Sequence, residues 1–189
     1  YGFQDRYRAV RGDMSAADAA DAIGGPQSDL TGGNGDGQLA DPSTNSWLEL
    51  SGVWAQLSHA GFIKGSYNGT SGDSTPPTAD EAPINVFNGI LVLGRHDGYY
   101  DASGGPATGA SAARLILTMG QNVPVDIARE LDVKVDDGNP RSGTLRNAVE
   151  GTAIYESDSS VVSCTDASGS EPIWDIAADS QSCNPTFLF

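Results

Sequence analysis

Residues 46–61 constrain the fold most strongly, because their pattern defines a whole helix from start to end. Ser46 and Glu49 fit a capping box at its beginning, and Gly61 stands where a left-handed cap commonly ends a helix. The apolar positions, three or four residues apart, are Trp47, Leu50, Trp54 and Leu57. We therefore predict a helix that packs its tryptophan face against a sheet or a neighbouring helix.

Apolar patterns elsewhere predict further helices and strands. Residues 85–95 and 114–119 are apolar and partly β-branched, which is typical of strands. A helix is expected from Pro124 to about Val135. The residues on one of its faces are Ile127, Leu131 and Val135. Weaker strand signals lie at residues 144–148, 159–164 and 186–189. Between these segments, the 24 glycines and 10 prolines predict long loops.

The first 23 residues are expected to form a helical stem. Phe3, Tyr7 and Val10 recur at spacings of four and three, so they share one helical face. Asp13 is a candidate cap for a second short helix that runs to Ile23, where glycines and a proline follow.

The charge balance excludes some partners. The chain has 25 acidic and 10 basic residues and a net charge of −15. Such a surface repels nucleic-acid phosphates and anionic lipid headgroups, so we expect no nucleic-acid partner. The excess of acids indicates either solubility or the binding of divalent cations.

Two segments are candidate cation sites. In the GNGDG loop, Asn34 and Asp36 alternate with glycines as in a calcium loop, but an EF-hand would need an acid where Asn45 stands. An ordinary Asx/Gly turn is the alternative. Farther on, Asp132, Asp136 and Asp137 form an acidic cluster at the end of a predicted helix. Either a bound cation such as Ca²⁺ or the backbone N–H groups of the next turn should offset their charge.

The cysteine count favours one disulfide. Cys164 and Cys183 are the two cysteines of the chain, and this usage suits an exported protein. Two reduced, buried thiols are the alternative. Enzymatic activity is not expected, because neither His59 nor His96 has metal-ligand spacing and no nucleophile or phosphate-loop motif occurs.

Four ordered blocks resemble a group of type IV pilin-like proteins that carry the prepilin-type cleavage and methylation signal. The blocks are YxAVxGDM at residues 7–14, GNGDG at 33–37, WxxLxxAGxIxGxY at 54–67 and DxKxDDGxPxxG at 132–143, followed by the cysteine pair. Arg11 replaces the usual proline of the first block. The apolar helix that precedes this block in the family is not among the 189 residues, so we expect it upstream or on a separate chain.

The resemblance implies an α+β fold in which the N-terminal helix packs on an antiparallel sheet and a C-terminal disulfide closes the head. It implies one pilin-like domain over residues 1–189, with a helical stem (1–23) and a globular head (24–189). The implied function is that of a structural subunit, a major or minor pilin or a pseudopilin, in an extracellular filament at the cell surface. Its partners would be copies of itself or other pilins, and the inner membrane would anchor it before assembly.

A subunit interface is expected on the first helix. Arg6, Arg8 and Arg11 are three of only ten basic residues, and they cluster at the base of an acidic head. They either meet acidic surface on a neighbouring subunit, together with Phe3 and Tyr7, or form a solvated helix face. A secreted calcium-dependent binding or adhesion module is the alternative function, and a secreted hydrolase with paired aspartates is a third.

Overall fold

The computed structural model describes residues 2–39, 47–69, 72, 76–101, 113–149 and 163–189. Its contacts divide the chain into two compact units, Tyr1–Pro83 and Ile84–Phe189. This division differs from the expected stem and head, because the helices of the stem share a unit with the tryptophan helix. The fold is mixed α+β with an antiparallel sheet and one disulfide, as predicted.

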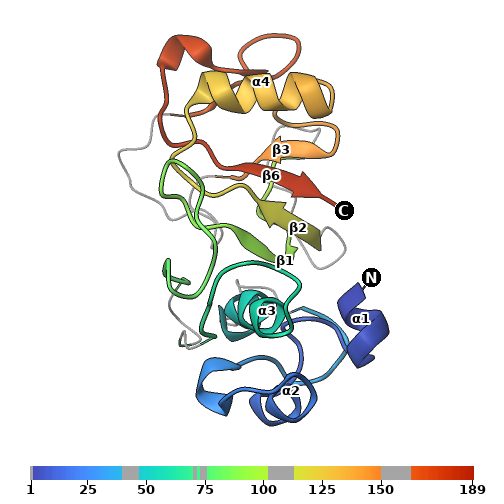
Figure 1. The fold of residues 1–189 in the computed structure, drawn as a ribbon. Helices are drawn as coiled ribbons and strands as arrows, with labels where there is room; N and C mark the ends of the chain where they lie inside the picture. The colour runs from blue at the N-terminus through green and yellow to red at the C-terminus, as the bar shows by residue number, and fades with distance from the viewer. Residues whose placement is uncertain (1, 40–46, 70–71, 73–75, 102–112, 150–162) are drawn as a thin grey trace. The chain divides into compact units, whose positions relative to one another are not determined.

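The N-terminal unit is helical. Its helices are α1 (Gly2–Tyr7), α2 (Ala16–Ile23), the short 3-10 helix η1 (Gln27–Asp29) and α3 (Trp47–His59) (Figure 1). Helix α1 does not continue to Val10, because Arg8 adopts a left-handed conformation with φ 58°. Ser15, not Asp13, caps α2: its hydroxyl accepts a hydrogen bond from the backbone N–H of Asp18.

The aromatic face of α1 packs on helical neighbours. Phe3 is buried in a cluster with Met14, Ala19 and Leu30, and Tyr7 packs against the same cluster. The resemblance implies that this helix packs on the sheet. The residues that bury Phe3 and contact Tyr7 belong to the N-terminal unit, and those on α2 include Ala19, Ala20 and Ile23.

Helix α3 matches its prediction closely. The side chains buried on it include Trp47, Leu50 and Trp54. It ends in a Schellman motif, in which the N–H of Phe62 donates to the carbonyl of Leu57 (2.9 Å) and that of Gly61 to Ser58 (3.0 Å). Gly61 has the left-handed φ of 77° that this motif requires. The predicted cap residue Ser46 lies outside the described residues.

The C-terminal unit contains a four-stranded antiparallel sheet in the order β1-β2-β6-β3. The strands are β1 (Val92–His96), β2 (Arg114–Thr118), β3 (Leu145–Asn147) and β6 (Pro185–Leu188). Strand β1 begins later than residue 85, because the side chain of Asn85 accepts hydrogen bonds from the N–H groups of Phe87 and Gly89 (2.8 Å each). These local bonds replace ladder pairing with a turn.

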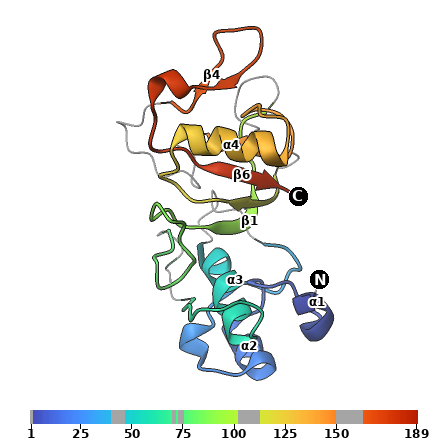
Figure 2. The same ribbon diagram turned by 45° about the horizontal axis from the view of Figure 1, so that its top comes forward.

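Helix α4 lies between this sheet and a two-stranded ladder (Figures 1 and 2). The elements are α4 (Val125–Val135), β4 (Thr165–Asp166), β5 (Ile173–Trp174) and the short 3-10 helix η3 (Ile176–Ala178). The buried residues of α4 are Val125, Ala128 and Asp132. The predicted apolar face is instead largely outward, since Ile127 is 44% and Val135 49% exposed.

The disulfide between Cys164 and Cys183 is present, with the Cα atoms 5.7 Å apart. It lies in a buried cluster with Val123, Val125, Ala128 and Trp174. The strand predicted at residues 159–164 falls mostly outside the described residues, and the neighbouring strand β4 begins at Thr165. Among the residues that the structure describes, no helix has the length and apolarity needed to cross a membrane.

Candidate functional sites

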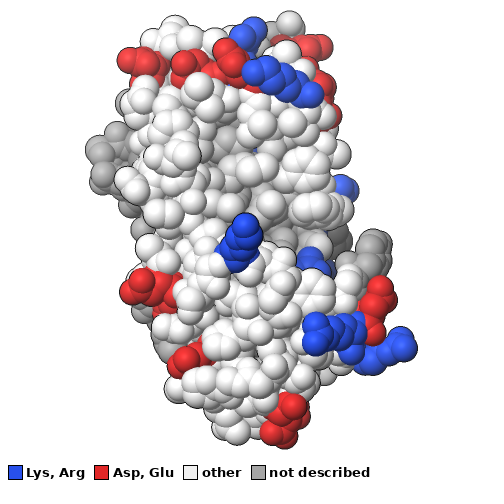
Figure 3. Space-filling view, in the orientation of Figure 1, with Lys and Arg blue, Asp and Glu red and all other residues white. Residues whose placement is uncertain are grey.

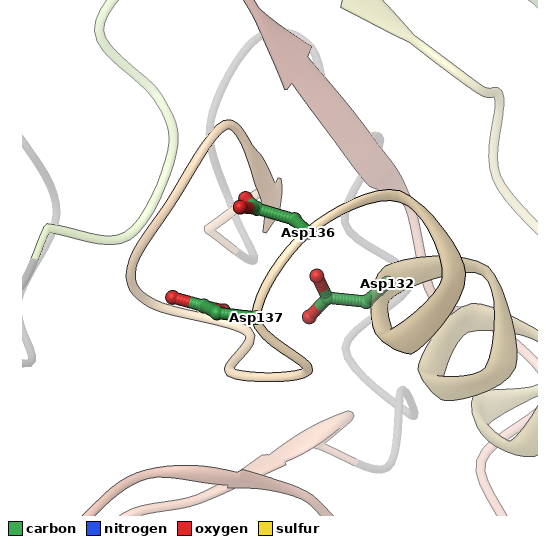
Figure 4. Close-up of side chains that lie close together, drawn as sticks. All are labelled: Asp132, Asp136 and Asp137. Carbon is green, nitrogen blue, oxygen red and sulfur yellow. The ribbon is translucent and has the colours of Figure 1, made fainter.

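Three aspartates gather at the C-terminal end of α4. Asp132 lies in the last turns of the helix, Asp136 is its C-terminal cap residue, and Asp137 follows (Figure 4). One carboxylate oxygen from each residue lies within 4.8 Å of the others. The structure therefore brings together the acidic cluster that the sequence predicts.

The carboxylate of Asp136 organises the turn that follows α4. Its Oδ2 accepts hydrogen bonds from the backbone N–H of Leu145 (2.9 Å), the hydroxyl of Thr144 (3.2 Å) and the N–H of Thr144. The Leu145 N–H is the main cause of a lowered Asp136 pKa, with contributions from Thr144 and the charge of Arg146. Backbone N–H groups of the following turn thus offset the charge of Asp136. This is one of the two forms of compensation expected from the sequence, and a bound cation is the other.

Asp137 closes the same turn from its other side. Its Oδ1 accepts from the N–H of Asn139 (2.8 Å) and its Oδ2 from the hydroxyl of Ser142 (2.6 Å). Gly138, which follows it, has a left-handed φ of 78°, as expected for the hinge of a turn. Asp137 itself is exposed.

Asp132 differs from the other two because its side chain is fully buried (0% exposed). The indole Nε1 of Trp174 donates a hydrogen bond to its Oδ2 (2.8 Å). Its Oδ1 has no hydrogen-bond partner among the described residues. Burial raises the pKa of Asp132, the charges of Asp137 and Asp136 raise it further, and Trp174 and the backbone N–H of Gly138 lower it.

No sequence pattern predicted the contact between Asp132 and Trp174. The two residues are 42 positions apart, and an aspartate within a helix is ordinarily assigned to the solvent side. A tryptophan near the second cysteine was the one available signal, since a buried indole needs an acceptor for its N–H.

The GNGDG loop is built around a buried carboxylate, that of Asp13. Its Oδ1 accepts from the N–H groups of Gly35 (2.9 Å) and Asp36 (3.1 Å), and its Oδ2 from that of Gly37 (2.8 Å). Asp13 is only 3% exposed. Sequence reasoning missed this role and assigned Asp13 to a helix cap.

Asn34 and Asp36 form consecutive Asx turns within that loop. The side chain of Asn34 accepts from the N–H of Asp36 (2.9 Å), and that of Asp36 from the N–H of Gln38 (2.9 Å). A calcium loop directs oxygen atoms inward, whereas this loop directs three N–H groups inward to an anion. The loop therefore has the geometry of an Asx/Gly turn and not that of a calcium loop.

The surface of α1 carries the basic residues that were predicted as an interface. Figure 3 shows Lys and Arg side chains gathered over α1. Arg6 and Arg8 are exposed and Arg11 is half-buried. The guanidinium of Arg6 lies 5.2 Å from the ring centroid of Tyr7.

Phe62, an exposed aromatic residue beside α1, was not predicted as part of this interface. Phe62 is 42% exposed, and its ring centroid lies 5.8 Å from that of Phe3. The signal available in the sequence was its position directly after Gly61, outside the apolar face of α3. Exposed aromatic side chains next to arginines are enriched in protein interfaces.

Comparisons with known proteins gave no match: no family model, curated protein or solved structure shows significant similarity to the chain.

Proposed function

We propose that the chain is a structural subunit of an extracellular filament. More narrowly, it is the head of a type IV pilin-like protein, either a major or minor pilin or a pseudopilin. Its partners are copies of itself or other pilins, and an apolar helix, upstream or on a separate chain, anchors it in the inner membrane before assembly. The resemblance of the four sequence blocks is the basis of this proposal, and the contacts among those blocks support it.

The observation that carries the proposal is that three of the blocks meet through buried hydrogen bonds. The backbone N–H of Gly12, in the first block, donates to Oε1 of Gln56, in the third (2.7 Å). Nε2 of Gln56 returns a hydrogen bond to the carbonyl of Met14 (3.1 Å). Asp13, between them, holds the second block. Gln56 stands at a position that the third block leaves open, so these hydrogen bonds join the segments that carry the resemblance and not its matched residues alone. In this way segments far apart in sequence serve one architectural purpose.

The residues of the fourth block also shape a turn of the backbone. Its Asp136 and Asp137 hold a turn by accepting backbone and hydroxyl hydrogen bonds, and its Gly143 has a left-handed φ of 68° close to the Asp136 carboxylate. Residues that shape loops are what a subunit with a variable outer surface needs.

The surface of α1 is the proposed contact with a neighbouring subunit. It combines exposed arginines, Arg6 and Arg8, with the partly exposed aromatic rings of Tyr7 and Phe62. A net charge of −15 on the whole chain makes acidic surface abundant on any neighbouring copy. Complementary charge of this kind steers association and fixes register more than it raises affinity.

Charge reversal at Arg8, directly after α1, tests this function. In cells that produce the full-length protein, we expect Arg8→Glu to lower the amount of chain in the sheared surface-filament fraction several-fold, with the cellular level unchanged. Lys64→Glu is the matched control, because Lys64 is also an exposed cation of the N-terminal unit. Detection of the wild-type chain only as a free secreted protein would reject the filament assignment. Equal filament amounts for the two variants would reject the α1 interface alone.

A further inference from the structure

We propose that Asp132, Asp136 and Asp137 bind one Ca²⁺ ion at the C-terminal end of α4. The inference does not depend on filament assembly, because it rests on the geometry of these three side chains. The ligand would be the hydrated ion, which exchanges some of its waters for carboxylate oxygens.

The spacing of the carboxylates fits a single calcium ion. One oxygen from each residue lies within 4.8 Å of the others. Calcium–oxygen distances of about 2.3–2.6 Å place two ligands on opposite sides of the ion at most about 5 Å apart. Three oxygens evenly spaced around one ion would lie at most about 4.5 Å apart, so the observed spacing of up to 4.8 Å requires only a small shift of the exposed Asp137 side chain for all three to reach the same ion. Calcium also tolerates the irregular geometry of a turn, whereas Mg²⁺ demands a near-octahedral shell and keeps more of its waters.

A second observation, independent of the spacing, is the unused oxygen of Asp132. This side chain is fully buried, and its Oδ1 has no hydrogen-bond partner among the described residues. Figure 4 shows the carboxylate pointing from α4 toward Asp136 and Asp137. A buried carboxylate oxygen without a partner is costly unless a cation or a proton compensates it. With two other carboxylates beside it, a cation is the compensation that also relieves their mutual repulsion.

Hydrogen bonds from the protein orient the carboxylates. Within the described part of the chain, they leave one oxygen of Asp132 and one of Asp136 without a donor, whereas each oxygen of Asp137 accepts one hydrogen bond, from Asn139 or Ser142, and keeps a lone pair for an ion. Trp174 occupies Oδ2 of Asp132, and Thr144 and Leu145 occupy Oδ2 of Asp136. Among the described residues, Oδ1 of Asp136 receives no hydrogen bond. Such outer contacts hold the ligands of metal sites in place. The guanidinium of Arg146, whose charge acts on Asp136, donates to backbone carbonyls of the C-terminal unit instead of forming an ion pair with the cluster.

Trp174 provides a reporter inside the site. Its indole N–H donates to Asp132, so its nitrogen–proton NMR signal should move when an ion binds the same carboxylate. Trp47 and Trp54, in the N-terminal unit, serve as internal controls. On titration of chelator-treated protein with CaCl₂, we expect the Trp174 signal to shift and to saturate at roughly 0.1–1 mM, the range of extracellular calcium modules. The Trp47 and Trp54 signals should stay in place, and Trp174→Phe assigns the reporter.

A matched pair of variants then locates the ion. Asp137→Asn removes one charge and keeps an oxygen for the Asn139 N–H, so we expect at least about tenfold weaker calcium binding in a folded chain. Asp166→Asn is the control, because Asp166 is another aspartate of the C-terminal unit, at the end of β4, and its carboxylate accepts hydrogen bonds from Ser168. The calcium affinity of this variant should match the wild type. The proposal is overturned if the wild-type Trp174 signal does not move at about 10 mM calcium. It is also overturned if the two variants titrate alike.

Discussion

The carboxylate of Asp13 fixes the loop of residues 33–37 through backbone donors alone. Three N–H groups converge on it from Gly35, Asp36 and Gly37. Hydrogen bonds to an ionised acceptor are stronger than neutral ones and add geometric precision. A loop with three glycines gains order in this way although it has few side chains to pack.

Removal of this carboxylate should release the loop. We expect Asp13→Ala to lower the free energy of unfolding by about 2–3 kcal/mol, because it deletes charge-assisted hydrogen bonds and leaves N–H groups that water satisfies only in part. Urea unfolding measures the change, and limited proteolysis should show new cleavage near residues 33–37. Asp21→Ala, an exposed change on α2, is expected to alter stability by less than about 0.5 kcal/mol. Equal effects of the two variants would contradict this role of Asp13.

At the scale of elements, close backbone approach holds the N-terminal unit together. Gly12 has a left-handed φ of 87°, and a Cβ atom there would lie 2.5 Å from both the carbonyl oxygen of Glu49 and Cγ2 of Val53 on α3. A larger residue would therefore push the segment after α1 away from α3. Gly61 has a similar φ of 77°, but a Cβ atom there would meet open space.

These two glycines allow strain and overlap to be separated. Gly61→Ala should cost about 1 kcal/mol, the price of a left-handed alanine. Gly12→Ala should cost about 1–3 kcal/mol more, because the overlap with α3 adds to the same strain. The comparison uses chemical denaturation of both variants under one set of conditions. Equal destabilisation by the two substitutions would contradict the predicted overlap of Gly12→Ala with α3.

Helix bounds could be predicted from the sequence, whereas several contacts could not. Gly61 follows the C-terminal end of α3 and Pro124 precedes α4, so local chemistry was sufficient at these two helix ends. The end of α1 was missed because a left-handed arginine, Arg8, has no sequence signature. The start of β1 was missed because a side-chain turn at Asn85 competes with strand pairing. The disulfide was predictable because the chain has only two cysteines.

The candidate cation site was predictable only in part. The spacing of the three aspartates placed them together, but the burial of Asp132 depends on Trp174, which comes from β5 far along the chain. The interface on α1 was predicted from its arginines, while Phe62 joins them through a helix end that brings it beside Phe3. Tertiary contacts of this kind override the local pattern.

At the scale of the whole molecule, each unit has its own buried core. The N-terminal core includes Phe3 and Leu30, and the C-terminal core surrounds the disulfide. The disulfide closes a loop with a sequence separation of 19. Its stabilising effect should therefore fall first on the C-terminal unit.

Loss of the disulfide tests this expectation. The double variant Cys164→Ser, Cys183→Ser should lower the free energy of unfolding of the C-terminal unit by about 3 kcal/mol, since the unfolded chain regains loop entropy. The native indole NMR signal of Trp174 should then be lost at a lower denaturant concentration than in the wild type. The denaturant midpoints of the Trp47 and Trp54 indole signals should change little. A parallel loss of all three signals, at the wild-type midpoint, would contradict this expectation.

The position of β6 has a consequence for the timing of folding. This strand is the last of the four in sequence, yet it lies between β2 and β3 and pairs with both. Before the ribosome has synthesised β6, β2 and β3 lack the strand that lies between them. The backbone N–H and C=O groups on the facing edge of each strand are then unpaired. The sheet can therefore close only after residues 185–188 have been synthesised, and until then the edges of β2 and β3 that face β6 have no partner strand in this sheet.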